Sequence, residues 1–539
     1  MIRNPVLPGF NPDPSFCRVG DDFYIATSTF EWYPGVQIHH SRDLVNWTLV
    51  TRPLTRRSQL DMRGNPDSCG IWAPCLSHAD GLFWLVYTDV KRFEGNFKDA
   101  HNYIVTAPSI EGPWSDPVYV NSSGFDPSLF HDDDGRKWFM NMLWNHRTNS
   151  IGGAPKVPAF DGIVLQQWDV QQRKLVGPVT NIYKGTQIGL VEGPHLFKRG
   201  GWYYLITAEG GTGYGHAVTM ARSRELLGPY ENHPNLHLLT SRESPDAPLQ
   251  RAGHGQVVEL ADGSTYVAHL CTRPLPGTRR SPLGRETAIQ RCEWHDDGWL
   301  YLAHGGQTPA VDVPSPFDVQ PRPREAVRRS FAGLTALPPE FQWLRTPEPD
   351  RLFTLTGNAL CLTGRESLGS WFEQSLVARR QEDWAFRAET TLRFSPVHYQ
   401  QAAGLTHYYN RHKFHTLVVT WHETLGRVLS ILSCPGDFPD NRVQFPLTEA
   451  IRLPADGEVS LAAQVDGATL QFRADWGQGW RDVGPVLDAS VISDEGGRGE
   501  HASFTGAFVG MVAFDTSGGG RVAEFGRFDY LPCQDPEPL

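Results

Sequence analysis

The sequence predicts an all-β protein in which an N-terminal five-bladed β-propeller precedes a C-terminal β-sandwich. Three observations lead to this fold class. Aromatic residues make up 11% of the 539 residues, and 53 glycines and 41 prolines interrupt segments in which apolar residues alternate every second position. A short unit recurs five times within residues 1–306. A Pro-rich stretch then separates this repetitive part from a second region of alternating segments.

Each copy of the repeat contains a glycine turn followed by an aromatic strand. The turn glycines are Gly20, Gly81, Gly135, Gly201 and Gly263. Their spacings are 61, 54, 66 and 62 residues. A second element precedes each turn, and these elements start at Asp13, Ala73, Asp126, Glu192 and His254. A strand, a hairpin turn and a second strand, with enough chain for two more strands, make one propeller blade. Five copies predict five blades, although spacing alone leaves open a run of hairpins in a sandwich.

The domain boundaries follow from the change in composition. Residues 1–306 are predicted to form the propeller, and the proline-rich residues 307–328 a linker. Residues 329–539 contain alternating segments at 386–394, 415–421 and 470–474, with turns at Asp456-Gly457 and Asp466-Gly467. We expect this second part to be a β-sandwich.

Charge and hydropathy exclude several classes of partner. The net charge is −11 and no block of like charges occurs, which disfavours binding to nucleic acid. No segment approaches the roughly 18 apolar residues of a membrane-spanning helix, and we find no secretory signal at the start of the sequence. The eight cysteines are widely spread, which favours reduced thiols. We therefore expect a cytoplasmic protein that acts on a neutral substrate.

Three acidic residues occupy equivalent positions of the repeat. In a propeller such positions converge on the central axis, so Asp13, Asp126 and Glu192 are expected to lie together, with Trp72 and His254 beside them. Clustered carboxyls raise one another's pKa, so one can serve as a protonated general acid while a better solvated one serves as a base. Hydrolysis of a glycosidic bond needs such a pair. Taken singly, each acid could instead cap a turn, and together they could bind Ca²⁺.

Other residues near the acids suit a sugar. The aromatic rings of Phe30, Trp32, Trp72 and Trp144 could stack on the apolar face of a sugar, or could belong to the core. Arg285 could bind a hydroxyl or keep Asp13 ionised, and a purely structural salt bridge is an equal alternative.

Ordered motifs over nearly the whole chain resemble glycoside hydrolase family 43, specifically its two-domain β-xylosidases. They include NPDPS at Asn11, FEWYPGV at Phe30, EGPH at Glu192, GRET at Gly284 and FTGA at Phe504. The resemblance implies a five-bladed propeller, a concanavalin-like jelly-roll sandwich, and hydrolysis with inversion of configuration.

The resemblance also implies roles for individual residues. Asp13 corresponds to the general base, Glu192 to the general acid, and Asp126 to the residue that raises the pKa of the acid and orients it. The residues expected to line the first sugar subsite are Phe30, Trp72, Thr212, His254 and Arg285. Phe504 is expected to extend from the sandwich and to close one side of the pocket. That closure implies an exo-acting enzyme, which releases xylose from the non-reducing end of β-1,4-xylooligosaccharides.

Several alternatives stay open at this point. The enzyme could be an α-L-arabinofuranosidase, or the propeller could bind carbohydrate without cleaving it. We expect no required cofactor or metal, although in the wider family a histidine at the position of His254 can bind Ca²⁺. We also expect a homo-oligomer.

Overall fold

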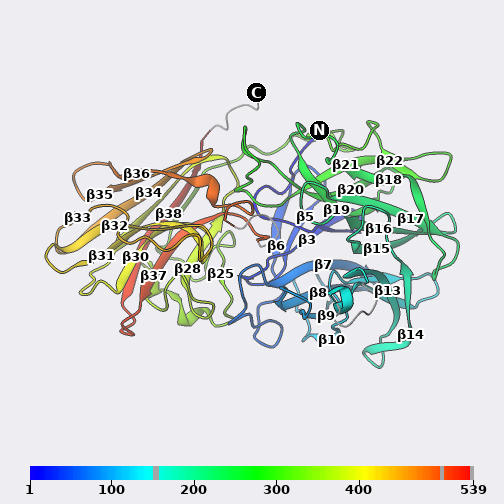
Figure 1. Cartoon of the computed structure of the whole chain (residues 1–539), viewed down its shortest axis with the longest axis horizontal. Helices are drawn as coiled ribbons and strands as arrows, with labels where there is room; N and C mark the ends of the chain where they lie inside the picture. The colour runs from blue at the N-terminus through cyan, green and yellow to red at the C-terminus, as the bar shows by residue number, and fades with distance from the viewer. Residues whose placement is uncertain (150–156, 498–502, 534–539) are drawn as a thin grey trace.

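The computed structural model describes residues 1–149, 157–497 and 503–533, and it consists of β-strands in two lobes (Figure 1). The blue-to-green N-terminal part forms one lobe and the yellow-to-red C-terminal part the other. Helical structure in the described residues is limited to three 3-10 helices, η1 (His146–Asn149), η2 (Pro349–Arg351) and η3 (Ala489–Val491). No helix in this part of the chain is long and apolar enough to cross a membrane.

The N-terminal lobe contains five antiparallel sheets of four strands. Blade 1 consists of β2 (Ser15–Val19), β3 (Asp22–Thr27), β5 (Gln37–Ser41) and β6 (Thr48–Thr51). Blade 2 consists of β7 (Gly70–Ala79), β8 (Leu82–Arg92), β9 (Asp99–Ala107) and β10 (Val118–Asn121). Blade 3 consists of β11 (Ser128–His131), β12 (Lys137–Trp144), β13 (Phe160–Asp169) and β14 (Lys174–Tyr183). Blade 4 consists of β15 (Glu192–Arg199), β16 (Trp202–Glu209), β17 (Ala217–Ser223) and β18 (Glu231–Thr240). Blade 5 consists of β19 (Gln250–Glu259), β20 (Thr265–Thr272), β21 (Glu286–Trp294) and β22 (Leu300–Leu302).

The first strands of the five blades form a closed ring. β2 contacts β7, and the contacts continue through β11, β15 and β19 back to β2. The predicted turn glycines lie between the first and second strand of every blade, where their φ angles are positive, from 62° to 84°. Glycine adopts this conformation without steric cost, which explains why the turns could be recognised in the sequence. The five predicted blades are confirmed.

Two short strands lie at the ends of the propeller sequence. β1 (Ile2–Arg3) pairs with β23 (Asp312–Val313), so the start of the chain is hydrogen-bonded to a segment inside the stretch predicted as a linker. Leu7 and Thr287 also form an isolated bridge, which attaches the N-terminal segment to blade 5. The bridge thus ties the first residues to the last blade, and the pairing with β23 ties them to the segment that follows this blade.

The C-terminal lobe is a sandwich of two antiparallel sheets. The larger sheet contains β24 (Val327–Ser330), β26 (Phe353–Leu355), β27 (Leu360–Thr363), β29 (Ala385–Arg393), β34 (Glu458–Asp466), β35 (Thr469–Asp475), β36 (Arg481–Asp488) and β38 (Val522–Pro532). The smaller sheet contains β28 (Ser375–Arg380), β30 (Gln401–Asn410), β31 (Lys413–His422), β32 (Gly426–Pro435), β33 (Ile451–Arg452) and β37 (Phe508–Asp515). Leu405 and Val419 of the smaller sheet and Leu461 and Phe525 of the larger belong to one buried core.

The two lobes share buried surface. β4 (Trp32–Tyr33) of the propeller pairs with β25 (Trp343–Leu344) of the sandwich, and the sandwich core continues into the propeller through Tyr33 and Ile71. Trp32 is fully buried and stacks on Phe508, with ring centroids 3.6 Å apart. The suggestion that Trp32 stacks on a sugar is therefore wrong, because its ring is used in the interface between the lobes.

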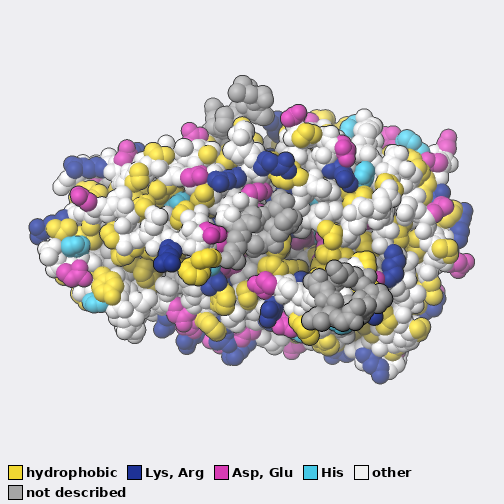
Figure 2. All heavy atoms as spheres, in the orientation of Figure 1, with side chains coloured by type: hydrophobic (Ala, Val, Ile, Leu, Met, Phe, Trp, Pro, Cys, Tyr) yellow, Lys and Arg dark blue, Asp and Glu magenta, His cyan; other side chains and the backbone are white. Residues whose placement is uncertain are grey.

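Charged side chains are mixed on the surface. On the face drawn in Figure 2, Lys and Arg side chains lie among Asp and Glu side chains instead of forming one basic area. The net charge of −11 is thus not accompanied on this face by a positively charged surface for a polyanion.

Candidate active site

A cavity of about 1040 Å³ opens where the inner strands of the blades begin. All nine residues predicted to act in catalysis or sugar binding line this cavity. They are Asp13, Phe30, Trp72, Asp126, Glu192, Thr212, His254, Arg285 and Phe504. The first eight belong to the propeller, whereas the last lies in the sandwich, shortly before β37. The structure thus brings the whole predicted set together, and the role of each residue stays a prediction.

The backbone has the same unusual conformation at the start of several blades. Asp13 and Asp126 both have φ of 55°, Ala73 has 33° and His254 has 47°. In blade 4 the positive φ, 57°, falls on Gly193, directly after Glu192. Non-glycine residues rarely adopt such angles, and they tend to occur where a functional side chain must be held in one direction. The repeat position found in the sequence therefore corresponds to a repeated local geometry at the cavity.

Asp13 is surrounded by groups that stabilise its ionised form. Arg285 Nη1 donates a hydrogen bond to Oδ1 at 2.9 Å, and the Ser28 hydroxyl donates one to Oδ2 at 2.6 Å. His254 Nδ1 lies 3.7 Å from Oδ1. Burial by itself raises the pKa of Asp13, but Arg285, His254 and Ser28 outweigh burial, so the pKa lies below its ordinary value. An ionised carboxylate in this place is suited to accept a proton from water.

Glu192 and Asp126 have the opposite electrostatic setting. Burial is the largest cause that raises the pKa of each carboxyl, and the charge of Asp13 raises both further. The N–H of Gly193 donates to Asp126 Oδ2 at 3.0 Å and so stabilises an ionised Asp126. The carboxyl of Glu192 accepts no hydrogen bond from any described residue, and Asp126 adds to the rise in its pKa. The two carboxyls titrate as a pair, and these differences favour a proton on Glu192, as a general acid requires.

Three aromatic rings form an apolar wall of the cavity. The ring centroids of Phe30 and Trp72 are 5.9 Å apart, those of Trp72 and Phe504 also 5.9 Å, and those of Phe30 and Phe504 6.4 Å. The guanidinium of Arg285 lies 5.3 Å from the centroid of Phe30. A wall of this kind beside polar groups suits the two-sided character of a sugar ring.

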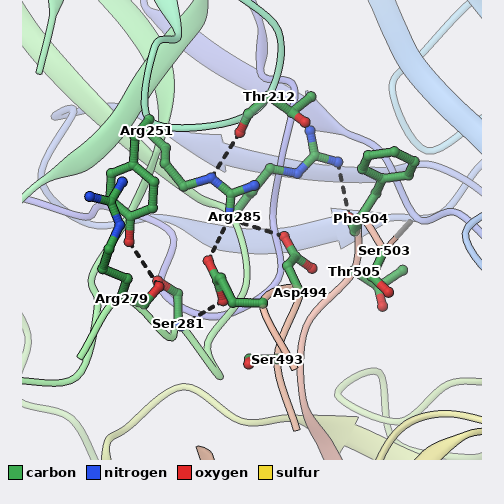
Figure 3. A network of polar contacts seen from close by, with 12 residues as sticks. Thr212, Arg251, Arg279, Ser281, Arg285, Ser493, Asp494, Ser503, Phe504 and Thr505 are labelled. Atoms are coloured by element: carbon green, nitrogen blue, oxygen red, sulfur yellow. Dashed lines mark hydrogen bonds and ion pairs between the residues drawn. The ribbon is translucent and has the colours of Figure 1, made fainter. Parts of the chain in front are cut away.

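The backbone of Phe504 is bonded to the propeller on both sides of its side chain. Its N–H donates to Ser68 Oγ at 3.1 Å. Its carbonyl accepts a hydrogen bond from Arg285 Nη2 at 3.0 Å, which Figure 3 shows. Arg285 therefore holds Asp13 with one guanidinium nitrogen and the sandwich segment with the other. The wall supplied by the sandwich is fixed to the same side chain that lowers the pKa of Asp13.

The cavity also has walls that the sequence did not predict. They include Phe93, Lys98 and Phe125 of the propeller and Trp371, Arg411 and Phe438 of the sandwich. Trp144, which the sequence suggested as a stacking ring, lines the cavity as well, and the Lys98 ammonium lies 4.0 Å from its centroid. Most of the unpredicted residues lie in loops outside the repeated element, so no spacing marked them.

The surroundings of His254 do not fit a metal site. The described residues contain no group of three or more His, Cys, Asp or Glu side chains that could hold a metal ion. The carboxylate of Asp13, whose Oδ1 lies 3.7 Å from His254 Nδ1, is already bonded to Arg285. Activity without a metal stays a prediction.

Comparison with known proteins identifies the family. Residues 2–300 match the family described as Glycosyl hydrolases family 43. The chain belongs to glycoside hydrolase family 43. Residues 328–531 match the domain described as Beta xylosidase C-terminal Concanavalin A-like domain. The family, the all-β fold with its two parts, and the glycosidase class predicted from the sequence are confirmed.

Similar proteins of this family extend over the full length of the chain. The chain is 58% identical over 541 residues to Xylosidase/arabinosidase 43B of Humicola insolens, covering 99% of this chain and 98% of that protein. It is 43% identical over 545 residues to Xylan 1,3-beta-xylosidase of a Vibrio species, covering 98% and 99% of the two chains. The crystal structure of xylan beta-1,4-xylosidase from Bacillus halodurans C-125 is similar with a TM-score of 0.93 and 49% identity, covering 98% of this chain and 100% of that one.

Proposed function

We propose that this family 43 enzyme is an exo-acting, inverting β-xylosidase that removes xylose from the non-reducing end of short β-1,4-linked xylooligosaccharides. One observation carries the proposal. Asp13, whose pKa Arg285 and its other neighbours hold below the ordinary value, lines the same cavity as Glu192, whose pKa burial raises above the ordinary value, and Phe504 forms one wall of that cavity. An acid and a base with separated pKa values are what hydrolysis of a glycosidic bond requires.

The mechanism follows from the protonation of the two residues. Asp13 accepts a proton from a water molecule as this water attacks the anomeric carbon. Glu192 donates its proton to the departing glycosidic oxygen from the other side of the sugar ring. Positive charge develops on the ring in the transition state. Asp126 supplies the negative charge that keeps the proton on Glu192 until the bond breaks.

Exo action is supported by the way the cavity is closed. Phe504 stands beside Phe30 and Trp72, and its backbone is bonded to Ser68 and Arg285 on both sides. A chain that continued past the terminal sugar on this side would meet a fixed segment of protein. The neutral xylose unit also suits a site that already holds three carboxyl groups.

Two measurements test this proposal. Proton NMR of fresh products from a β-linked substrate should show α-xylose first, and β-xylose appearing first would contradict inversion. Early products of xylotetraose should be xylose and xylotriose, whereas early xylobiose would contradict exo action. Digestion of β-1,3-linked and β-1,4-linked xylobiose in parallel separates the two linkages that occur in the names of the similar proteins.

A second activity, cleavage of terminal α-L-arabinofuranosides, is supported by the name of the Humicola insolens relative, which includes arabinosidase. Rates on the 4-nitrophenyl β-xyloside and α-L-arabinofuranoside decide which sugar is preferred. The non-catalytic carbohydrate-binding propeller that the sequence left open is not retained, because the chain belongs to a family of glycosyl hydrolases.

We further propose that the enzyme acts in the cytoplasm as a homo-oligomer. Light scattering coupled to size-exclusion chromatography measures the molar mass in solution. A mass equal to that of one chain would contradict the homo-oligomer. Fractionation of the source cells tests the location.

A further inference from the structure

A buried arginine joins the propeller wall of the sugar pocket to the sandwich. Arg251 is fully buried. Its Nε donates to the carbonyl of Thr212 at 2.8 Å, and its Nη1 donates to Glu495 Oε1 at 2.8 Å and lies 3.3 Å from Asp494 Oδ2 (Figure 3). Thr212 lines the cavity, whereas the two carboxylates follow η3 in the sandwich. One side chain therefore contacts both lobes directly behind the pocket.

The contacts continue from Asp494 to the base. The hydroxyl of Tyr409 donates to Asp494 Oδ1 and accepts a hydrogen bond from the N–H of Thr505 at 2.8 Å. Thr505 follows Phe504, whose carbonyl accepts from Arg285 Nη2. Arg285 Nη1 in turn donates to Asp13. A path of hydrogen bonds and one peptide link thus runs from Arg251 to the carboxylate predicted to activate water.

A second path runs through Glu495. Its Oε2 accepts the N–H of Ser281 at 3.0 Å, and the carbonyl of Pro282 accepts the N–H of Ala507 at 2.8 Å. These bonds hold the propeller loop that leads into Arg285 against the segment that carries Phe504. Both sides of the contact between Arg285 and Phe504 are therefore attached to the pair of carboxylates that Arg251 binds.

The charges explain why an arginine stands at this place. A buried cation is stable only when it is paired and hydrogen-bonded, and Arg251 meets this condition with two carboxylates and a carbonyl. Burial raises the pKa of Asp494 to about 6, against the opposing effect of Arg251. The neighbouring His216 is neutral, because burial lowers its pKa to about 3. A planar fork reaches the carbonyl and the carboxylates at once, which a lysine ammonium cannot do.

We propose that Arg251 is a positioning residue, which fixes the Thr212 wall and the Phe504 wall of the sugar pocket relative to each other and so maintains the contact of Arg285 with Asp13. This role rests on the proposed function, because only that function makes the two walls part of a sugar-binding site. It adds a residue that contacts no substrate itself but determines the geometry of residues that do.

The variant Arg251→Lys tests the geometry without removing the charge. We expect kcat/KM on 4-nitrophenyl β-xyloside to fall about tenfold or more, since displacements near 1 Å at reacting groups cost up to about a hundredfold. We also expect the acid limb of the pH profile of kcat/KM to move up by about half a pH unit. Arg285 lowers the pKa of Asp13, so a looser Arg285 raises that pKa. A merely structural role would reduce the amount of active enzyme and leave KM and this limb unchanged.

Arg280→Ala is the matched control. Arg280 crosses the same interface, donating to Ser490 Oγ at 2.8 Å and to Asp488 Oδ2 at 3.1 Å, but its side chain is 38% exposed and it does not line the cavity. We expect its kcat/KM to stay within about threefold of wild type, as for an exposed ion pair. A fall as large as that of Arg251→Lys would overturn the proposal in favour of general docking of the lobes.

Tyr409→Phe tests the same path if Arg251→Lys does not fold. This change keeps the ring and removes the hydroxyl that links Asp494 to Thr505. We expect Tyr409→Phe to change KM and to move the acid limb in the same direction as Arg251→Lys does. Where both variants fold, the effects of the two changes should be less than additive, because the two residues lie on one path of hydrogen bonds. Unchanged KM and an unmoved limb in the folded variants would overturn the proposal.

Binding of xylose, measured by calorimetry, separates this proposal from the proposed function. A wild type that turns over no xyloside refutes the function. The positioning role is refuted if Arg251→Lys binds xylose with the affinity of the wild type and, where the wild type is active, also has the same pH profile.

Discussion

A single methyl group added at Gly284 should disturb the active site from outside it. Gly284 has φ of +72° and lies directly against the sandwich segment. A Cβ at this position would stand 2.3 Å from the carbonyl oxygen of Thr505 and 2.8 Å from Cα of Gly506. Ordinary contact begins near 3.4 Å, so the change Gly284→Ala forces the two backbones about 1 Å apart.

The size of the effect follows from what this displacement moves. Phe504 precedes Thr505 and Arg285 follows Gly284, so the shift opens the hydrogen bond between them and loosens the hold on Asp13. A displacement of about 1 Å at a positioned group costs up to about a hundredfold in rate. We therefore expect kcat/KM on 4-nitrophenyl β-xyloside to fall roughly 30- to 100-fold. The stability loss should include about 1 kcal/mol for the positive φ, together with a steric part.

Gly263→Ala is the control for the loss of stability that an alanine causes at a positive φ angle. Gly263 lies in the turn of the same blade, has φ of +84°, and a Cβ there would meet no atom within 4 Å. It should lose about 1 kcal/mol of stability through its φ angle and keep its activity. Thermal unfolding and steady-state kinetics of both variants are the assay. If Gly284→Ala keeps kcat/KM within twofold of Gly263→Ala, the argument that the sandwich segment holds the active site is refuted.

Three further predictions concern the carboxyls and the metal. Asp126→Asn removes a negative charge that raises the pKa of Glu192, so the basic limb of the pH profile should move to lower pH, and an unmoved limb would contradict the role of Asp126. Asp13→Asn removes the base and should lower kcat about 10²- to 10⁴-fold; a loss below tenfold, with folding verified by circular dichroism, would exclude Asp13 as the base. Treatment with a chelator, followed by dialysis, should leave activity unchanged, and a loss that Ca²⁺ restores would contradict the prediction that no metal is required.

The sequence predicted most of what the repeat determines. The turn glycines and the elements at Asp13, Asp126, Glu192 and His254 recur at regular intervals, because each blade needs the same hairpin and the same inner strand. The segments at 386–394, 415–421 and 470–474 likewise fall on β29, β31 and β35 of the sandwich. Positions defined by local geometry or by repetition are thus visible in a single sequence.

The interface between the lobes could not be predicted in this way. Trp32 lies two residues from Phe30, and the motif does not indicate that one ring faces the cavity while the other stacks on Phe508. Arg251 finds its carboxylate partners more than 240 positions further along the chain. Contacts of this kind arise from tertiary packing and leave no spacing or composition that could mark them.

The pairing of β1 with β23 and the late position of Phe504 have a consequence for synthesis on the ribosome. The N-terminal strand must wait until residue 313 has emerged before it finds its partner. By then all three acids have been made, together with Phe30 and Trp72, but Phe504 follows nearly two hundred residues later. A nascent chain of that length thus contains every predicted acid but still lacks the residues that form the sandwich side of the cavity. Substitutions in the last part of the gene therefore change one side of the cavity and leave the three acids unchanged.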